Sequence, residues 1–372
     1  MGVNTKIEWC DFTFNCWRGC QKVAPGCYNC YAEAQSKRNP GTLGIWGPNG
    51  TRVVASEAMW REPVNWNRKA EQLRGEFAEL RAERNSLMFA GKPPRPRVFC
   101  ASLADVFEDW DGQCKMSDGR WANNCYTSGI LDRFTGVSLA KGKSATTLND
   151  VRARLFKLID ATPHLDWLLL TKRPENVRQM WPSADCVVYH DGDELRTVGI
   201  DGVDRRGALR AHRSNVWLGT SIACQDDADR NIPLLLQCRD LSPVLFLSIE
   251  PLVGPVMLHH WIDESGMFHH SQGVDVDWVI VGGESGPNAR PCRVEWIRDI
   301  VRQCQEVGVP CFVKQLGSNV IHSEQEAASV AGMWDASQQH FRPLLTDPKG
   351  GDPSEWPEDL RVREVPCDHR SR

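Results

Sequence analysis

NVWLGTSIACQDDADRNIPLLLQCRDLSPVLFLSIEP, residues 215–251, contains two apolar runs separated by a helical pattern. The runs NVWLGTSI and PVLFLSIEP are almost continuously hydrophobic, which is typical of parallel strands that are covered on both faces. Between them, DDADRNIPLLLQC has the apolar spacing of an amphipathic helix. A strand, a helix and a second strand in this order predict a right-handed crossover within a parallel sheet.

The same alternation continues on both sides of this unit. Helical patterns precede two of the other apolar runs, and the second pattern ends at Gly308, a plausible helix C-cap. Repeated units of this kind favour a partial or complete parallel (β/α) barrel over a small open sheet. The further strands are predicted at RVFCAS (97–102), DWLLLTKR (166–173), DWVIVGGES (277–285) and PCFVKQLG (310–317), and the helices at DVRARLFKLIDAT (150–162) and VEWIRDIVRQCQEVG (294–308).

Insertions interrupt the alternation, and the predicted barrel therefore spans residues 1–320 with a cysteine-rich loop at 16–31. A charged helix is predicted at EQLRGEFAELRAER (71–84) and a hairpin, turned at Asp-Gly-Asp, within 187–202. Residues 321–372 are predicted to form an extended C-terminal segment that packs on the barrel. The insertions lie near 41–90, 112–147 and 184–213.

Composition restricts the class of protein. With 41% hydrophobic and 25% charged residues, the chain is predicted to be globular and soluble. The formal net charge of −4 gives no general reason to expect nucleic-acid binding. No apolar run is long enough to span a membrane, and MGVNTKIEWCDF lacks the pattern of a secretory signal, so a cytoplasmic location is expected. In such a compartment, an odd number of cysteines (fifteen) argues against a disulfide framework.

Polar residues stand at the carboxyl ends of the predicted strands. Ligands bind outside these ends in parallel β/α proteins, because all the strands end at the same edge of the sheet. We therefore expect an active-site rim there. Its candidate members are Ser102, Asp105, Thr171, Lys172, Arg173, Ser221, Glu250, Gly282, Gly283, Glu284, Lys314 and Gln315.

The other notable feature is GCQKVAPGCYNCYAE, residues 19–33, which holds Cys20, Cys27 and Cys30. Thiolates at this spacing bind a soft or borderline metal ion. Together with Cys16 they could close a tetrahedral zinc site. Without Cys16, three thiolates could hold a [4Fe-4S] cluster and leave one iron open for a chelating cofactor such as S-adenosylmethionine (SAM). The spacing alone leaves both interpretations open.

This cysteine segment, with TKIEW (5–9) before it and IWGPNGTRVVASEAMWREPVNWNRKA (45–70) after it, resembles a three-Cys-motif family found in bacteriophages and prophages, which is similar to radical-SAM proteins. The resemblance extends through LLLTKRPENV and DWVIVGGESGPNARPC. It implies a radical-SAM-type partial barrel with the cluster loop after a short strand at TKIEW. It also implies cluster ligation by Cys20, Cys27 and Cys30, with Cys16 outside the ligand set. The C-x6-C-x2-C spacing departs from the usual CxxxCxxC signature.

The resemblance implies an iron-sulfur, SAM-dependent enzyme that needs an electron donor and acts on a nucleotide or nucleic-acid substrate. Glu284, Glu250 and Lys172 are the expected catalytic residues, although Arg290 could instead pair with Glu284. The alternative is a zinc-stabilised, non-catalytic module that binds nucleic acid or a partner protein. The expected cofactor contacts are Ser102, Asp105, Ser221, Gly282, Gly283 and Glu284, and the expected substrate contacts are Thr171, Arg173, Lys314 and Gln315.

Overall fold

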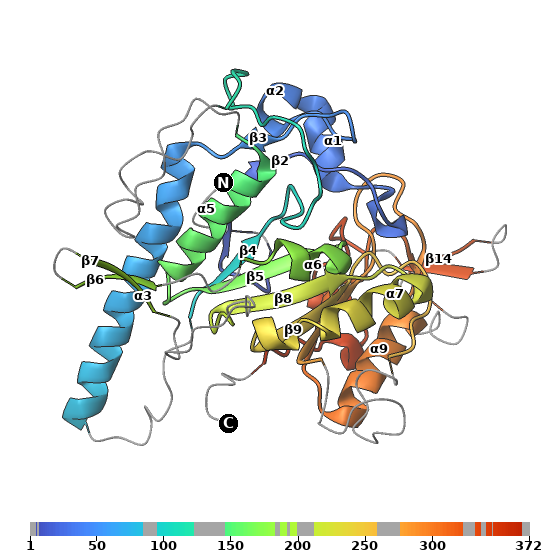
Figure 1. Ribbon diagram of the computed structural model, residues 1–372. Helices are drawn as coiled ribbons and strands as arrows, with labels where there is room; N and C mark the ends of the chain where they lie inside the picture. Colours follow the sequence, from blue (N-terminus) through green and yellow to red (C-terminus); the bar gives the residue numbers. More distant parts are fainter. Residues whose placement is uncertain are drawn as a thin grey trace.

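A seven-stranded parallel sheet, curled into a half-barrel, forms the centre of the molecule (Figure 1). The computed structural model describes residues 5, 7–84, 95–122, 146–182, 187–191, 194–198, 212–258, 276–322, 332–335, 340–343 and 345–366. All neighbouring strands run parallel, in the order β1-β4-β5-β8-β9-β10-β12. They are β1 (Phe12–Thr13), β4 (Arg97–Cys100), β5 (Asp166–Thr171), β8 (Val216–Ser221), β9 (Val244–Ile249), β10 (Trp278–Gly282) and β12 (Cys311–Gln315).

The six strands predicted from apolar runs are confirmed, and so are the three predicted helices. A capping box formed by Thr147 and Asp150 begins the first of these helices, and Gly308, in the left-handed conformation (φ 73°), ends the last. Burial on both faces explains why these strands were recognisable in the sequence. The helices are α5 (Leu148–Asp160), α7 (Gln225–Leu236) and α9 (Val294–Val307), and the short α6 (Pro174–Met180) follows β5.

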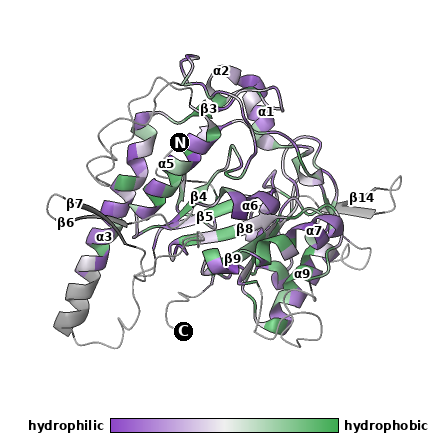
Figure 2. Cartoon of the chain, viewed as in Figure 1, coloured by the Kyte–Doolittle hydropathy of each residue, from purple (hydrophilic) through white to green (hydrophobic). Residues whose placement is uncertain are grey.

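The helices cover one face of the sheet, and each presents an apolar side to it and a polar side to solvent (Figures 1 and 2). Alternate strand residues therefore enter two different cores. Val98, Leu169 and Leu218 pack with the helices, whereas their neighbours Phe99, Leu168 and Trp217 point to the inner face. The inner core is largely aromatic, and its buried members are Trp9, Cys10, Phe99, Leu168, Trp217, Val244, Phe246, Trp278, Ile280 and Phe312.

The prediction of a first strand at TKIEW is wrong, because β1 begins only at Phe12. Residues Glu8 and Trp9 form a turn, and the Trp9 ring lies 4.7 Å from Phe99 and 6.3 Å from Trp278. The apolar residues of TKIEW therefore contribute to the inner aromatic core. They do not extend the sheet.

The insertions add smaller elements around the half-barrel. The predicted hairpin is confirmed as the antiparallel pair β6–β7, and the predicted charged helix is the second half of the longer α3. The predicted insertion near 112–147 is described at residues 112–122, where no helix or strand forms, and at residues 146–147, which lead into α5. The added elements are α1 (Tyr31–Arg38), α2 (Pro40–Leu43), α3 (Glu57–Arg84), β2 (Trp17–Arg18), β3 (Val53–Val54), β6 (Val187–Asp191), β7 (Glu194–Val198), β11 (Cys292–Arg293), β13 (Val320–Ile321), β14 (Gly332–Asp335) and β15 (His340–Pro343).

The C-terminal segment hydrogen-bonds along the free edge of β12. The Val313 amide donates to the Val362 carbonyl, and the Glu364 amide donates to the Cys311 carbonyl, each at 2.8 Å. Two short 3-10 helices, η4 (Pro353–Glu355) and η5 (Glu358–Leu360), precede this contact. Across the described ranges, no helix is long and apolar enough to cross a membrane.

Candidate functional site

The cysteine loop, defined here as residues 19–31, crosses the carboxyl ends of the central strands. Its first residue donates a backbone hydrogen bond (3.1 Å) to Leu103, just after β4. Near its middle, Gly26 approaches residues that follow β5, β8 and β9: a Cβ at this position would lie within 3.5 Å of Lys172, Ala223 and Pro251. The loop and the polar strand ends, which are far apart in the sequence, therefore form one region of the molecule.

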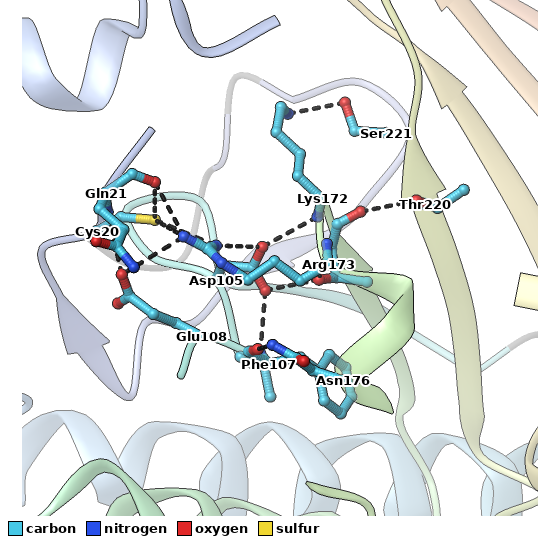
Figure 3. A network of polar contacts seen from close by, with 12 residues as sticks. Cys20, Gln21, Asp105, Phe107, Glu108, Lys172, Arg173, Asn176, Thr220 and Ser221 are labelled. Carbon is cyan, nitrogen blue, oxygen red and sulfur yellow. Dashed lines mark hydrogen bonds and ion pairs between the residues drawn. The ribbon is translucent and has the colours of Figure 1, made fainter. Parts of the chain in front are cut away.

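Arg173 joins the beginning of the cysteine loop to the end of β5 (Figure 3). Its guanidinium contacts the Asp105 carboxylate at 2.9 Å and donates to the Gln21 carbonyl at 2.9 Å. The same group lies 3.6 Å from the Cys20 sulfur. Because Arg173 is only 4% exposed and has these three partners, it holds the loop in place.

Glu108 is the other residue that forms this first attachment. Its carboxylate accepts the Gln21 amide at 3.0 Å and pairs with Arg52 through two hydrogen bonds of 2.7 and 2.8 Å. Both members of the Glu108–Arg52 pair are fully buried. Arg173 also lies 3.6 Å from this carboxylate. Removing Glu108 would leave the buried Arg52 charge without its carboxylate partner, which is strongly destabilising.

A second attachment holds the other end of the cysteine loop to β10. The Glu284 carboxylate accepts hydrogen bonds from the Asn29 side chain (2.9 Å) and from the Arg290 backbone amide (2.8 Å) and guanidinium (2.7 Å). Arg290 also donates to the Pro25 carbonyl at 2.9 Å. Burial alone would raise the pKa of Glu284, but the hydrogen bonds from Arg290 and Asn29 and the Arg290 charge outweigh it, so the pKa is lowered.

Tyr31, which directly follows the last cysteine of the loop, reaches back to β4. Its hydroxyl donates to the Ser102 carbonyl at 2.5 Å, and its side chain is nevertheless 53% exposed. The Ser102 hydroxyl accepts a hydrogen bond from Asn15 at 3.0 Å. Ser102 thus contacts the loop through its backbone, and its side chain is already bonded elsewhere.

The three thiols of the loop are free and half-buried. Burial, reinforced by the charge of Glu108, raises the pKa of Cys20 to about 12, although Arg173 partly offsets the rise. Burial likewise raises the pKa of Cys30. Metal binding would therefore have to release protons from both thiols. Over the described residues, no three His, Cys, Asp or Glu side chains are gathered closely enough to hold a metal ion.

Cys16 differs from the other three cysteines in its environment. It is fully buried in the core between the sheet and the helices, and it interacts with the equally buried Cys100. The remaining described cysteines are also free, and all except Cys224 are buried. The buried thiols among them behave as small core hydrophobes.

Four polar residues on the inner face form what we call the strand-end cluster: Lys172, Ser221, Glu250 and Lys314. The Lys172 ammonium donates to the Ser221 hydroxyl at 2.8 Å, and that hydroxyl donates to the Glu250 carbonyl at 3.2 Å. The Glu250 carboxylate pairs with the Lys314 ammonium. Both charged side chains of this pair are partly exposed, at 19% and 22%.

A register irregularity lies beside Lys314. The register between β10 and β12 shifts after Val281, where Val313 is the partner, so that Gly282 pairs with Gln315 and Lys314 is the extra residue. Because side chains alternate along a strand and Phe312 enters the inner core, Lys314 lies on the same inner face. There it reaches Glu250, which follows β9, across the intervening strand β10.

Several predicted site residues are buried below the rim. Thr171 is 1% exposed and donates to Asp105 at 2.7 Å, and Gln315 donates to the Gly283 carbonyl at 2.8 Å. Gly283 is required by the fold, because a Cβ there would lie 2.0 Å from the Leu316 carbonyl oxygen. Contact of these residues with a cofactor or substrate stays a prediction.

Sequence reasoning missed Asn29, Glu108 and Arg52, which complete the two attachments of the loop. Asn29 lies between Cys27 and Cys30 in the sequence, and this position next to the candidate metal ligands could have indicated a role in the site. No sequence pattern indicates the pairing of Glu108 with Arg52, since it depends on the path of an irregular loop. The pairing of Arg290 with Glu284, weighed from the sequence, is confirmed.

Comparison with known proteins identifies the family of the chain but gives no activity. No curated protein matches the chain, and no solved structure matches it either. One family model, described as "Protein of unknown function (DUF5131)", matches residues 4–118 and 137–341. These two segments make up most of the sequence, and the chain therefore belongs to the DUF5131 family.

Proposed function

We propose that this protein is a SAM-dependent radical enzyme whose [4Fe-4S] cluster is held by Cys20, Cys27 and Cys30. One observation carries the proposal: the loop that bears the three free thiols lies across the carboxyl ends of a parallel half-barrel, next to the strand-end cluster. The radical-SAM likeness and a phage source enter the proposal from the resemblance of the cysteine segment alone.

The donor chemistry fits such a cluster, because thiolates are its usual ligands and Arg173 supplies positive charge beside Cys20. When bound, a reduced cluster would supply the electron that cleaves SAM to a 5′-deoxyadenosyl radical. The chain itself would orient the substrate and exclude water. Arg173 holds the loop at Gln21, and Glu284 holds it at Asn29.

Zinc is the second candidate for the same thiols, and it would make the loop a structural element of a binding module. Zinc prefers a closed set of four ligands in structural sites. The only further cysteine in the segment is Cys16, which is buried in a different core region. This placement favours the three-ligand interpretation.

Metal analysis of protein purified without oxygen tests the proposal. We expect about four irons and four sulfides per chain, with broad absorption near ~400 nm from thiolate-to-iron charge transfer. Cys20→Ala, Cys27→Ala and Cys30→Ala should each lose the cluster. Cys224→Ala is the matched control, because Cys224 is also free and half-buried, and it should retain the metal.

Two outcomes would contradict the proposal. A colourless protein with one zinc per chain, also lost in Cys16→Ala, would establish the zinc-stabilised module. If the protein binds iron but forms no 5′-deoxyadenosine from SAM under reducing conditions, the cluster assignment would hold and radical-SAM chemistry would be excluded.

A further inference from the structure

The strand-end cluster carries a net positive charge. It contains two ammonium groups and one carboxylate, and these lie on the same face of the sheet as the inner aromatic core. Partial burial of charge is costly unless each group is paired. Lys314 has the Glu250 carboxylate, whereas Lys172 hydrogen-bonds a neutral hydroxyl and acts electrostatically on the Cys30 thiol.

The position of Lys314 is a second, independent observation. Lys314 is the extra residue where the register between β10 and β12 shifts, and such irregularities are frequent beside active sites. Its ammonium contacts the Glu250 carboxylate, and Lys172 is linked through Ser221 to the Glu250 backbone carbonyl. The two lysines therefore approach the same residue, Glu250, from different strands.

Arg173, another cation among the expected substrate contacts, is already occupied by Asp105, Gln21 and Cys20. An incoming anion can therefore be met by Lys172 and Lys314. Lysine ammonium groups are compact point charges that are well suited to phosphate. Phosphate would compete with Glu250 for Lys314, because both are anions.

Tyr31 supplies an aromatic side chain from the cysteine loop, whose Gly26 packs against Lys172. Its hydroxyl donates to the Ser102 carbonyl, and 53% of the side chain is exposed. An exposed aromatic ring on a loop that crosses cationic strand ends is a surface on which nucleobases can stack.

We infer that the strand-end cluster binds the phosphate of a mononucleotide, with Lys172 and Lys314 as the phosphate ligands and Tyr31 as the stacking surface for the base. This inference names the substrate class of the proposed enzyme and to that extent rests on the proposed function. Glu250 acts as a built-in competitor that occupies Lys314 until the phosphate displaces it.

Isothermal titration of the full-length protein with a nucleoside monophosphate, inorganic phosphate and the unphosphorylated nucleoside tests the inference. Lys172→Gln and Lys314→Gln should each weaken binding of the monophosphate and of phosphate about tenfold, or about 1.4 kcal/mol. Glu250→Gln should tighten both several-fold, because it frees Lys314. Tyr31→Leu should weaken the monophosphate and leave inorganic phosphate unchanged.

Lys69→Gln, an exposed lysine on α3, is the matched control and should bind as the wild type does. Lys314→Arg keeps the charge and shows whether a loss reflects charge or folding. The inference is overturned if both lysine-to-glutamine variants bind phosphate normally, or if Glu250→Gln weakens binding as they do. Iron content is measured on the same samples, so failure of the nucleotide site remains distinct from failure of the cluster.

Discussion

Gly219 shows how one residue adapts the strands to the aromatic interior. A Cβ at this position would lie 2.5 Å from the Phe246 ring on the neighbouring strand β9. Gly219→Ala should therefore force a shift in a close-packed core and lower the free energy of unfolding by about 1–3 kcal/mol. Gly75→Ala is the control: Gly75 lies in α3 with no atom near its Cβ position, and alanine should stabilise that helix by roughly 0.5–1 kcal/mol. Equal effects in denaturant titrations would refute the packing argument.

Glu284 should make the attachment of the cysteine loop dependent on pH. Since its pKa is lowered in the folded protein, its contribution is fully present above the ordinary carboxyl value of 4.5 and is lost as the pH falls through the lowered value. Glu284→Gln should cost roughly 1–3 kcal/mol at pH 7, because Arg290 loses its charged partner. The difference from the wild type should shrink below pH 4.5.

Unfolding free energies of both proteins between pH 7 and pH 3.5 would measure this dependence. Glu358→Gln, at an exposed position in η5, provides the control and should follow the wild-type curve. A constant difference between Glu284→Gln and the wild type across this pH range would show that the carboxylate charge does not hold the loop.

At the scale of the element, the success of strand prediction depended on burial. The central strands are covered by helices on one face and by aromatic rings on the other, so nearly every position is apolar. The edge strand β1 has only two paired residues. The sequence before it is apolar because Trp9 packs in the inner core, and not because it forms a strand. Local hydrophobicity could not distinguish a strand from a core-filling turn.

The candidate site was predictable only in part for a related reason. Parallel strands end together, so the sequence could place polar residues such as Lys172 and Glu250 at one edge. It could not predict the register shift beside Lys314, because register is a property of two paired strands. The attachments of the cysteine loop were beyond reach as well, since Asn29 and Glu284 are separated by 255 positions.

The C-terminal segment should protect the edge of β12. A chain that ends after Pro357 would lose the backbone pairing of Val362 and Glu364, the bond from the Trp278 indole to Glu364, and the buried Leu360. We expect a loss of roughly 2–5 kcal/mol and a tendency to self-associate through the exposed edge. A chain that ends after Pro366 keeps all these contacts and should match the full-length protein in melting temperature and gel filtration. Equal behaviour of the two truncated chains would contradict this role.

For the whole molecule, the cysteine loop acts as a bridge between the two halves of the sheet. One attachment uses residues that follow β4 and β5, and the other uses residues that follow β10. Along the chain, Cys27 lies between the attachments at Gln21 and Asn29, and Cys20 and Cys30 directly flank them. A ligand that draws the thiols together would therefore stabilise both attachments at once. A ligand bound at one strand end alone would stabilise only one of them.

Hydrogen exchange with and without reconstituted iron and sulfide tests this coupling. Anything that binds only the native state adds to its stability, so loading should slow exchange at both ends of the bridge. The informative amides are those of Gly19 and Gln21, bonded to Leu103 and Glu108, and that of Arg290, bonded to Glu284.

The Val313 amide in β12 is bonded to Val362 of the C-terminal segment and belongs to neither attachment of the loop. It therefore serves as the reference for global stability. We expect slowing at Gly19, Gln21 and Arg290 beyond any change at Val313, and no such excess in Cys27→Ala, which should not take up the cluster. Slowing confined to Gly19 and Gln21 would mean that the metal orders one half of the loop only. In that event the two attachments would be independent, and Glu284 would have no part in positioning the cysteines.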